Sequence, residues 1–234
     1  MYAAKGLSMA DQDWNESINK RRKAVRVRKK TGRSNSSQAW IIRQVNDPYV
    51  AAAKELGYRS RAAFKLLQID KKYRILKKGQ NILDLGAAPG GWTQVAMAKT
   101  GPGHVVGIDL LPIDPIDGAE LILGDMRDDA DIERMQNRFP GGADVVLSDM
   151  APNTTGDTAT DHLRVVGLAE IALNVAIACL KPGGWFVCKF WQGGAEGELR
   201  ALLQKHFAKV QYFKPESSRK DSAEMFLVAS GFRR

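Results

Sequence analysis

The chain has 234 residues, of which 44% are apolar and 26% charged, and its formal net charge is +9. This composition suits a soluble protein with one folded domain and a short extension. No apolar run approaches the roughly 18 residues that a bilayer span needs, and the first residues lack the order of a signal peptide. We therefore expect a cytoplasmic protein that does not bind a membrane.

The two cysteines and three histidines give no sign of a metal site. Cys179 and Cys188 lie in apolar surroundings without a CxxC partner, so buried free thiols are expected rather than a disulfide. The histidines, at positions 104, 162 and 206, are far apart in the sequence. The sequence predicts no bound metal.

Positive charge is concentrated at the N-terminus. Residues 1–38 carry ten Lys and Arg against three acidic residues, whereas residues 39–234 carry 25 against 23. Nine of these basic residues fall in Lys20–Arg33, followed by the linker-like Ser34–Ser37. A block of like charges repels itself and buries little. Residues 1–38 are therefore predicted to be a disordered tail that contacts nucleic acid or only aids solubility, and residues 39–234 the folded domain.

Helices and strands alternate along the predicted domain. Helical spacing covers Ser60–Tyr73, with Ser60 as the N-cap. The predicted strands are Asn81–Leu85, His104–Asp109, Glu120–Gly124, Ala143–Asp149, Trp185–Trp191, Val210–Lys214 and Met225–Ser230. The first helix between the strands follows the glycine-rich turn and ends near Lys99. The later helices are Ala130–Phe139, Asp161–Leu180 and Gly197–Phe207. This order predicts an α/β fold with a mostly parallel sheet covered on both faces, and an antiparallel pair at one edge.

Polar residues recur where the predicted strands end. In parallel sheets of this kind, ligands bind beyond the carboxyl ends of the strands. The residues at these ends are Asp84 with the turn Gly86–Gly91, then Asp109, Asp125, Asp149 and Lys189. We therefore expect the functional site at this edge of the sheet.

The turn Gly86–Gly91 predicts a cofactor site. Its glycines allow close backbone approach to a ligand, and it precedes a helix whose free N–H groups face the ligand. The spacing is not the GxGxxG of dinucleotide sites, and Pro89 lacks an N–H that a pyrophosphate would use. An adenosine-type ligand such as S-adenosylmethionine fits better, with Asp109 accepting from the ribose hydroxyls, Asp125 from the adenine amino group, and Met126 packing on the ring.

The alternative from another enzyme class is an NAD-dependent dehydrogenase. The sequence disfavours this alternative, because the GxGxxG spacing of dinucleotide sites is missing. The predicted strand ends also have no His or Tyr nearby that could take part in hydride transfer.

Four side chains are candidates for catalysis. A lysine inside WFVCKFW, Lys189, is partly desolvated, and desolvation favours the neutral amine that a general base needs. Carboxylates nearby oppose this effect. Taken singly, Lys189 also reads as a lysine reaching from a strand end to solvent, Lys65 as a surface lysine, and Glu224 as a solvated loop carboxylate. Asp149 follows the fourth strand.

Together the motifs resemble one family. SRAAFKL, DLGAAPGGW, DLLP, SDMAPN, the lysine of VCKFWQG and SRKDSAEMFLVA are similar to the ordered motifs of the FtsJ/RrmJ (RlmE-type) family of ribosomal RNA methyltransferases. The resemblance covers about Asp47 to Phe232. It implies a Rossmann-like sheet of seven strands, mostly parallel, with the last strand inserted antiparallel as one antiparallel edge strand.

The resemblance also implies roles for single residues. Lys65, Asp149, Lys189 and Glu224 match the family's catalytic tetrad. The residues that match its S-adenosylmethionine contacts are Gly90, Trp92, Asp109, Asp125 and Asp149. The basic tail is longer than expected for the family, which leaves its role open.

The expected reaction is methylation of the ribose 2′-oxygen of a uridine in the A-loop of 23S rRNA, on the assembled large subunit. The alternatives are a 2′-O-methyltransferase of tRNA or mRNA caps and a non-catalytic ribosome-assembly factor. The RNA must be locally unpaired to present a ribose hydroxyl to the enzyme. We expect basic or aromatic groups near Arg59, Arg61 and Trp191 to help hold the unpaired segment. A monomer is expected, because no heptad pattern appears.

Overall fold

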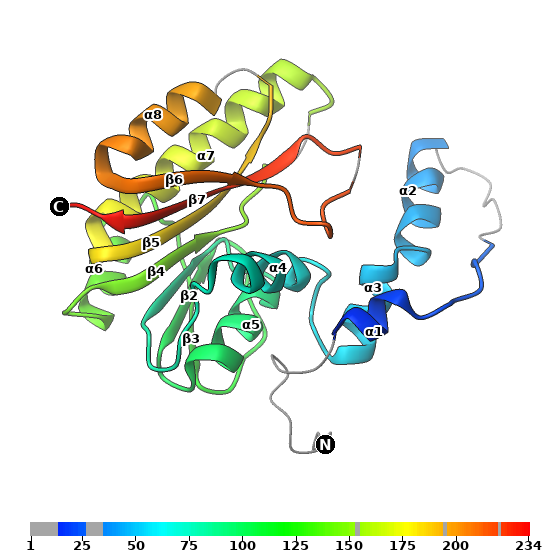
Figure 1. Cartoon of the computed structure of the whole chain (residues 1–234), viewed down its shortest axis with the longest axis horizontal. Coiled ribbons are helices and arrows are strands. Elements are labelled where there is room, and N and C mark those ends of the chain that lie inside the picture. Colours follow the sequence, from blue (N-terminus) through cyan, green and yellow to red (C-terminus); the bar gives the residue numbers. More distant parts are fainter. Residues whose placement is uncertain (1–13, 27–34, 153–154, 194–195, 220) are drawn as a thin grey trace.

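A computed structural model describes residues 14–26, 35–152, 155–193, 196–219 and 221–234. A seven-stranded sheet lies between two layers of helices (Figure 1). The strands are β1 (Ile82–Leu85), β2 (Val105–Asp109), β3 (Ala119–Leu123), β4 (Ala143–Ser148), β5 (Leu180–Trp191), β6 (Phe207–Phe213) and β7 (Glu224–Phe232). The helices are α1 (Trp14–Asn19), α2 (Asn35–Val45), α3 (Pro48–Leu56), α4 (Ala63–Tyr73), α5 (Gly91–Thr100), α6 (Asp129–Arg138), α7 (Thr158–Cys179) and α8 (Glu196–His206).

The order of the strands confirms the predicted sheet. It runs β3-β2-β1-β4-β5-β7-β6. Strands β1 to β5 pair in parallel, and β7 pairs antiparallel with both β5 and β6. The antiparallel strand β7 is therefore inserted second from the edge, with β6 outside it. Each predicted strand is present, and the boundaries differ by a few residues at most except at the start of β5.

Alternate residues of the central strands face two different cores. Val145 of β4 and Val187 of β5 belong to the core under α3, α4 and α5. Their neighbours Val146 and Phe186 belong to the core under α6, α7 and α8. Because both faces of the sheet are covered, these strands read as continuous apolar runs instead of alternating ones.

Helix α7 corrects the expectation that no apolar segment approaches the length of a bilayer span. Its segment Ala159–Cys179 is long and apolar enough to cross a membrane by length and composition alone. The helix nevertheless packs on β5 and β4. It contributes to the core Val165, Ala169, Ala172, Leu173, Val175 and Ala176. Burial against the sheet therefore accounts for one apolar face of this helix, whereas Leu163 is 69% exposed.

Both cysteines are buried and free, as predicted. Burial raises the pKa of the Cys179 thiol to about 11 and that of Cys188 to about 12. Neither thiol is therefore ionised at neutral pH, which is consistent with a packing role.

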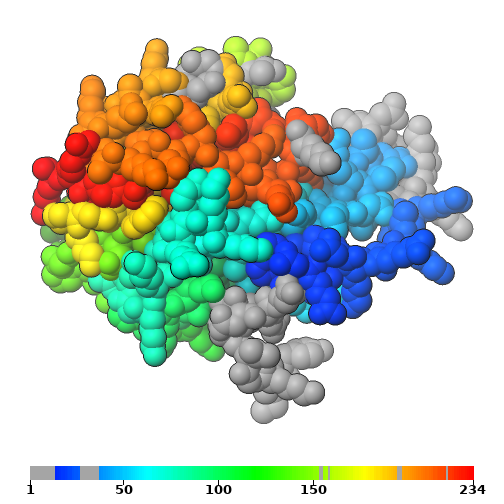
Figure 2. Space-filling model, viewed as in Figure 1, coloured from blue at the N-terminus to red at the C-terminus, as the bar shows by residue number. Residues whose placement is uncertain are grey.

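The N-terminal segment differs from the expected disordered tail. Residues 14–26 lie against the domain: the Trp14 ring is 6.2 Å from that of Phe64, and Glu55 pairs with both Lys20 at 2.8 Å and Arg22 at 3.0 Å. In Figure 2 this blue segment lies beside α4. Charge density predicted disorder here, whereas Trp14 and Ile18 pack on the core under α4 and the ion pairs with Glu55 add polar contacts. The rest of the predicted tail, residues 1–13 and 27–34, lies outside the described residues.

Helices α2 and α3 were not predicted. The proposed linker Ser34–Ser37 instead overlaps the start of α2. Asp47 is the N-cap of α3: its side chain accepts from the Tyr49 N–H at 2.9 Å, and Pro48 follows as the first helical residue. The Asp-Pro pair is a recognisable helix start, so this helix could have been found in the sequence. The two helices lie beyond the carboxyl end of the parallel strands (Figure 1).

Candidate active site

The glycine-rich turn joins β1 to α5 as predicted. Gly86 has a φ of +73°, and a Cβ there would collide with Met150. Gly90, with a φ of +107°, is the N-cap of α5 and has no side chain that could cap the helix. Asp84 accepts from the Thr93 N–H, so the N–H groups of Gly91 and Trp92 are the ones that can face a ligand at the edge of the sheet.

Asp84 is a structural residue of this turn. It lies inside β1 with 1% of its surface exposed, and its Oδ2 accepts from the Thr93 hydroxyl at 2.6 Å. The bond fixes the first turn of α5 to the sheet. Burial, with the charges of Asp149 and Asp109 adding to it, raises the pKa of the Asp84 carboxyl to about 7.

The raised pKa of Asp84 predicts a pH dependence of stability. The folded protein holds this proton up to about pH 7, whereas the unfolded chain releases it near pH 4. The folded state therefore binds more protons between these values, and Asp84 makes stability fall as the pH rises from about 4 to 7. The Asp84→Asn variant should lose this contribution. Urea unfolding at several pH values measures it.

A surface variant, Asp117→Asn, removes a carboxylate that lies in water, and its stability should follow that of the wild type across this pH range. If Asp84→Asn and wild type also change in parallel with pH, the Asp84 carboxyl is not the group responsible.

The two carboxylates predicted to hold the adenosine part lie at the ends of β2 and β3. Asp109 accepts from the backbone N–H of Ala88 at 2.9 Å through Oδ2 and of Leu111 at 2.8 Å through Oδ1. Asp125 is held by Arg127, whose Nη2 lies 2.5 Å from its Oδ2. Each Asp109 oxygen has a second lone pair, so Asp109 can accept from the hydroxyls of a ribose. Both Asp125 oxygens already accept two hydrogen bonds each from Arg127, so Arg127 would have to move before Asp125 could accept from an amino group.

Other predicted residues play supporting roles. Met126 belongs to the core under α6 and is 7% exposed, so its packing on an adenine ring stays a prediction. Trp92 is only 3% exposed, and its Nε1 donates to the Ala62 carbonyl at 2.8 Å. A ligand contact at residue 92 would therefore use its backbone N–H. Arg59 donates to the carbonyls of Pro89, Asp114 and Pro115, so it ties the turn to the loop after β2.

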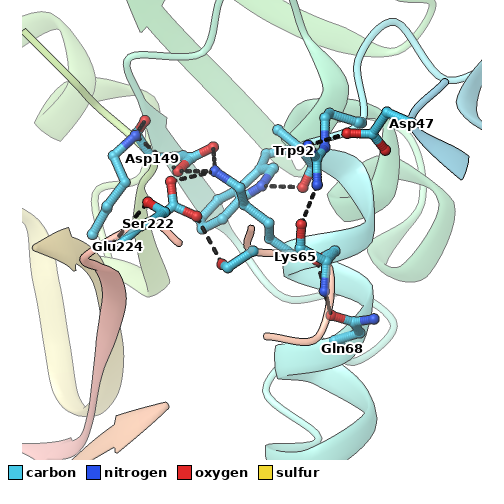
Figure 3. Close-up of polar contacts among 12 residues, drawn as sticks. Asp47, Lys65, Gln68, Trp92, Asp149, Ser222 and Glu224 are labelled. Atoms are coloured by element: carbon cyan, nitrogen blue, oxygen red, sulfur yellow. Dashed lines mark hydrogen bonds and ion pairs between the residues drawn. The ribbon is translucent and has the colours of Figure 1, made fainter. Parts of the chain in front are cut away.

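The four predicted catalytic side chains meet in one ion-pair network (Figure 3). Lys65 Nζ lies 2.8 Å from Glu224 Oε2 and 3.2 Å from Asp149 Oδ1. Lys189 Nζ lies 3.1 Å from the same Asp149 oxygen and donates to the Asp149 carbonyl at 2.6 Å. Asp149 thus links both amines, and Lys65 links both carboxylates.

Four separate elements bring this network together. Lys65 is on α4, Asp149 follows β4, Lys189 is near the end of β5, and Glu224 is the first residue of β7. In the β5–β7 ladder Glu224 lies opposite Trp191, so the antiparallel insertion of β7 delivers it to the carboxyl end of the parallel strands. The prediction that the four residues lie close together is confirmed.

Charge pairing decides the protonation of the buried members. Burial alone would raise the pKa of the Asp149 carboxyl, but the charges of Lys65 and Lys189 outweigh it and lower the pKa. Burial alone would lower the pKa of the Lys65 amine, but Asp149 and Glu224 reverse this and raise it. Lys65 therefore stays an ammonium group near neutral pH.

A second polar network surrounds the first and was missed in the sequence. Arg61 donates to Asp47 and to the Ser217 carbonyl, and Gln68 Oε1 accepts from the Ser217 N–H at 2.9 Å. Ser218 Oγ then donates to Glu224 Oε1 at 2.8 Å. These contacts fix the segment before β7 and orient Glu224. The partners are far apart in the sequence, so no local motif indicates this network.

An open hollow adjoins the ion-pair network. It has a volume of about 250 Å³ and is lined among others by Trp40, Gln44, Lys65, Ser217, Arg219 and Glu224. We call it the α2 hollow, because Trp40 and Gln44 come from α2. Because Lys65 and Glu224 line the α2 hollow, it is a candidate binding site for a substrate.

Comparison with known proteins gives a consistent picture. The model of the FtsJ-like methyltransferase family matches residues 58–232. A relative in Acidiphilium cryptum, named ribosomal RNA large subunit methyltransferase E, is 58% identical over 92% of this chain and 95% of its own length. A relative of the same name in Granulibacter bethesdensis is 55% identical over 91% and 92%.

A solved structure shares the fold. A protein from Plasmodium falciparum, described as a ribosomal RNA methyltransferase, is 31% identical and superposes with a TM-score of 0.67, covering 75% of this chain and 98% of that one.

Proposed function

The chain belongs to the FtsJ-like methyltransferase family, and from this membership we propose that it transfers a methyl group from S-adenosylmethionine to the 2′-oxygen of a ribose in large-subunit ribosomal RNA. The observation that carries the proposal is the ion-pair network of Lys65, Asp149, Lys189 and Glu224 at the edge of the sheet. We propose that its amines and carboxylates bind the hydroxyl and take up its proton.

Lys189 is the proposed general base. Its side chain is 6% exposed and pairs with one carboxylate, whereas Lys65 pairs with two. Lys65 is thus held by both carboxylates, and Lys189 is the amine with the smaller number of carboxylate partners. After loss of one proton, Nζ offers a lone pair to the 2′-hydroxyl and accepts its proton. Lys65 stays charged and, with Glu224, positions the hydroxyl, while Asp149 holds both amines.

The methyl donor would be held at the ends of β1, β2 and β3. We propose the α5 N-terminus with Gly90 and the Trp92 N–H for its amino-acid part, and Asp109 and Asp125 for its adenosine part. S-adenosylmethionine supplies an electrophilic methyl group when it is bound. The Asp149 carboxylate lies at the same edge and favours the positive sulfonium. Alignment of the hydroxyl by the network would account for much of the rate.

The relatives favour a ribosomal target. Their shared name refers to the large subunit, and the proposed target is a uridine in the A-loop of 23S rRNA on the assembled subunit. We propose that residues 39–234 are the methyltransferase domain, that the enzyme acts in the cytoplasm as a monomer, and that it needs neither a metal nor a membrane. A tRNA or an mRNA cap is the alternative acceptor.

The test offers tritiated S-adenosylmethionine with assembled large subunits, naked 23S rRNA and tRNA. Label on the large subunit, resistant to alkaline cleavage at one uridine, is the expected result, because a 2′-O-methyl group blocks cleavage there. Label on tRNA alone, or on a base instead of a ribose, would contradict the proposal. A variant with Lys181→Met, on the same strand as Lys189 but at the opposite end, should transfer label as the wild type does.

A further inference from the structure

The α2 hollow has one wall that no catalytic role explains. Helix α2 makes few contacts with the domain beyond its junction with α3 and polar contacts to the segment before β7, such as Arg219 Nη2 to Gln44 Oε1 at 3.1 Å. In Figure 2 this light-blue helix adjoins the orange segment of the chain. Within the described residues, α2 is thus held at the mouth of the ion-pair network instead of in the core.

Trp40 is the unusual residue of this wall. Its side chain lines the α2 hollow and yet is 55% exposed. An indole ring at that exposure buries little surface within its own chain, so folding does not account for its place. Lys65 and Glu224 line the same hollow. The Trp40 ring and the catalytic candidates Lys65 and Glu224 therefore line the same hollow.

The hollow also carries unbalanced positive charge. Arg61 and Arg219 share one carboxylate, Asp47, from which Arg219 Nη2 is 3.9 Å away. Both arginine Nε atoms are buried without a hydrogen-bond partner in the described part of the chain. Lys65, Lys189, Asp149 and Glu224 cancel one another in charge. One cationic group is left over at the hollow, and a phosphate is a suitable partner for it.

We propose that the α2 hollow is the RNA-strand subsite, in which an unstacked base stacks on Trp40 and a backbone phosphate binds Arg219. Single-stranded RNA is recognised by this combination of aromatic stacking and positive charge. A strand that brings a 2′-hydroxyl to Lys65 and Glu224 has its own base and phosphate beside that ribose, where Trp40 and Arg219 lie. The inference rests on the proposed RNA methylation and adds the residues that hold the strand.

The first experiment compares the wild type with Trp40→Ala, Trp40→Phe and Val45→Ala in steady-state methylation of large subunits. Loss of one base–aromatic stack corresponds to about a 5- to 160-fold rise in KM for Trp40→Ala, with kcat nearly unchanged. Phenylalanine keeps a stacking face and should restore most of the loss. Val45 is 43% exposed on the same helix, lies outside the hollow, and its variant should match the wild type.

A second measurement does not depend on turnover. A short uridine-rich single-stranded RNA is titrated onto the protein while tryptophan emission is followed. The wild type should show quenching that Trp40→Phe loses. In the same binding assay Arg219→Gln should lower the slope of log affinity against log salt by about 0.7, the value for one phosphate contact on a single strand. Arg43→Gln, 53% exposed on the same helix, should keep the wild-type slope.

Two results would overturn the subsite. One is an unchanged KM in Trp40→Ala together with full quenching in Trp40→Phe. The other is a loss of kcat alone, because it would mean that α2 supports the chemistry instead of the strand. Failure of the proposed function looks different: the wild type itself would then transfer no methyl group to a ribose of the subunit.

Discussion

Replacing Lys189 with methionine is expected to lower kcat for methyl transfer by about 10²- to 10⁴-fold, the usual contribution of a general base. Methionine has nearly the length of lysine and suits a side chain that is 6% exposed, but it cannot take a proton. Single-turnover transfer to large subunits measures the chemical step, and calorimetry with S-adenosylmethionine checks that the donor still binds.

An arginine at the same position separates two roles of Lys189. Arginine keeps the positive charge but remains protonated at any accessible pH. If Lys189 is the base, Lys189→Arg should be as slow as Lys189→Met. If Lys189 only supplies charge, the arginine variant should recover much of the rate. The matched control is Lys181→Met, which removes a half-exposed partner of Asp144 from the same strand and should leave kcat unchanged.

The sheet could be predicted because its signals are local. Each strand is a short apolar run, and β2 and β4 end at or just before an aspartate, so the order and direction of the strands follow from these runs and from the helices between them. The segment before Trp40 was harder. Its charge density predicts disorder, whereas residues 14–26 dock through contacts such as that of Trp14 with Phe64. The prediction of disorder used the average charge and hydrophobicity of the segment, and a few apolar side chains change that average very little.

The site shows the same division between local and distant information. The turn Gly86–Gly91 has a local spacing, and Lys65, Asp149, Lys189 and Glu224 were found through flanking motifs that resemble a family. No spacing relates Arg61 to Ser217, which are 156 residues apart and meet only in the folded chain. Trp40 gives no motif at all. Its interest comes from its exposure at a hollow beside Lys65, which only the structure shows.

Replacing Asp149 with asparagine is expected to destabilise the protein by about 3 kcal/mol at pH 7, near the cost of removing one partner from a buried ion pair. The amide has nearly the same shape but leaves the Lys65 and Lys189 amines, 3.2 and 3.1 Å from Oδ1, without the charge between them. Urea unfolding gives the free energy. Glu120→Gln, which breaks two pairs at the surface, should cost less than about 1 kcal/mol.

The pH dependence of this loss identifies its cause. The pKa of the Asp149 carboxyl is lowered by folding, so its stabilising contribution is complete above the unfolded value near 4 and disappears as the pH falls through the folded pKa. The gap between wild type and Asp149→Asn should therefore be constant near neutral pH and narrow below pH 4. A gap that stays constant in acid would indicate lost packing. Adding Lys189→Met to Asp149→Asn should regain part of the stability, because it removes one of the two amines that the first substitution leaves without a partner.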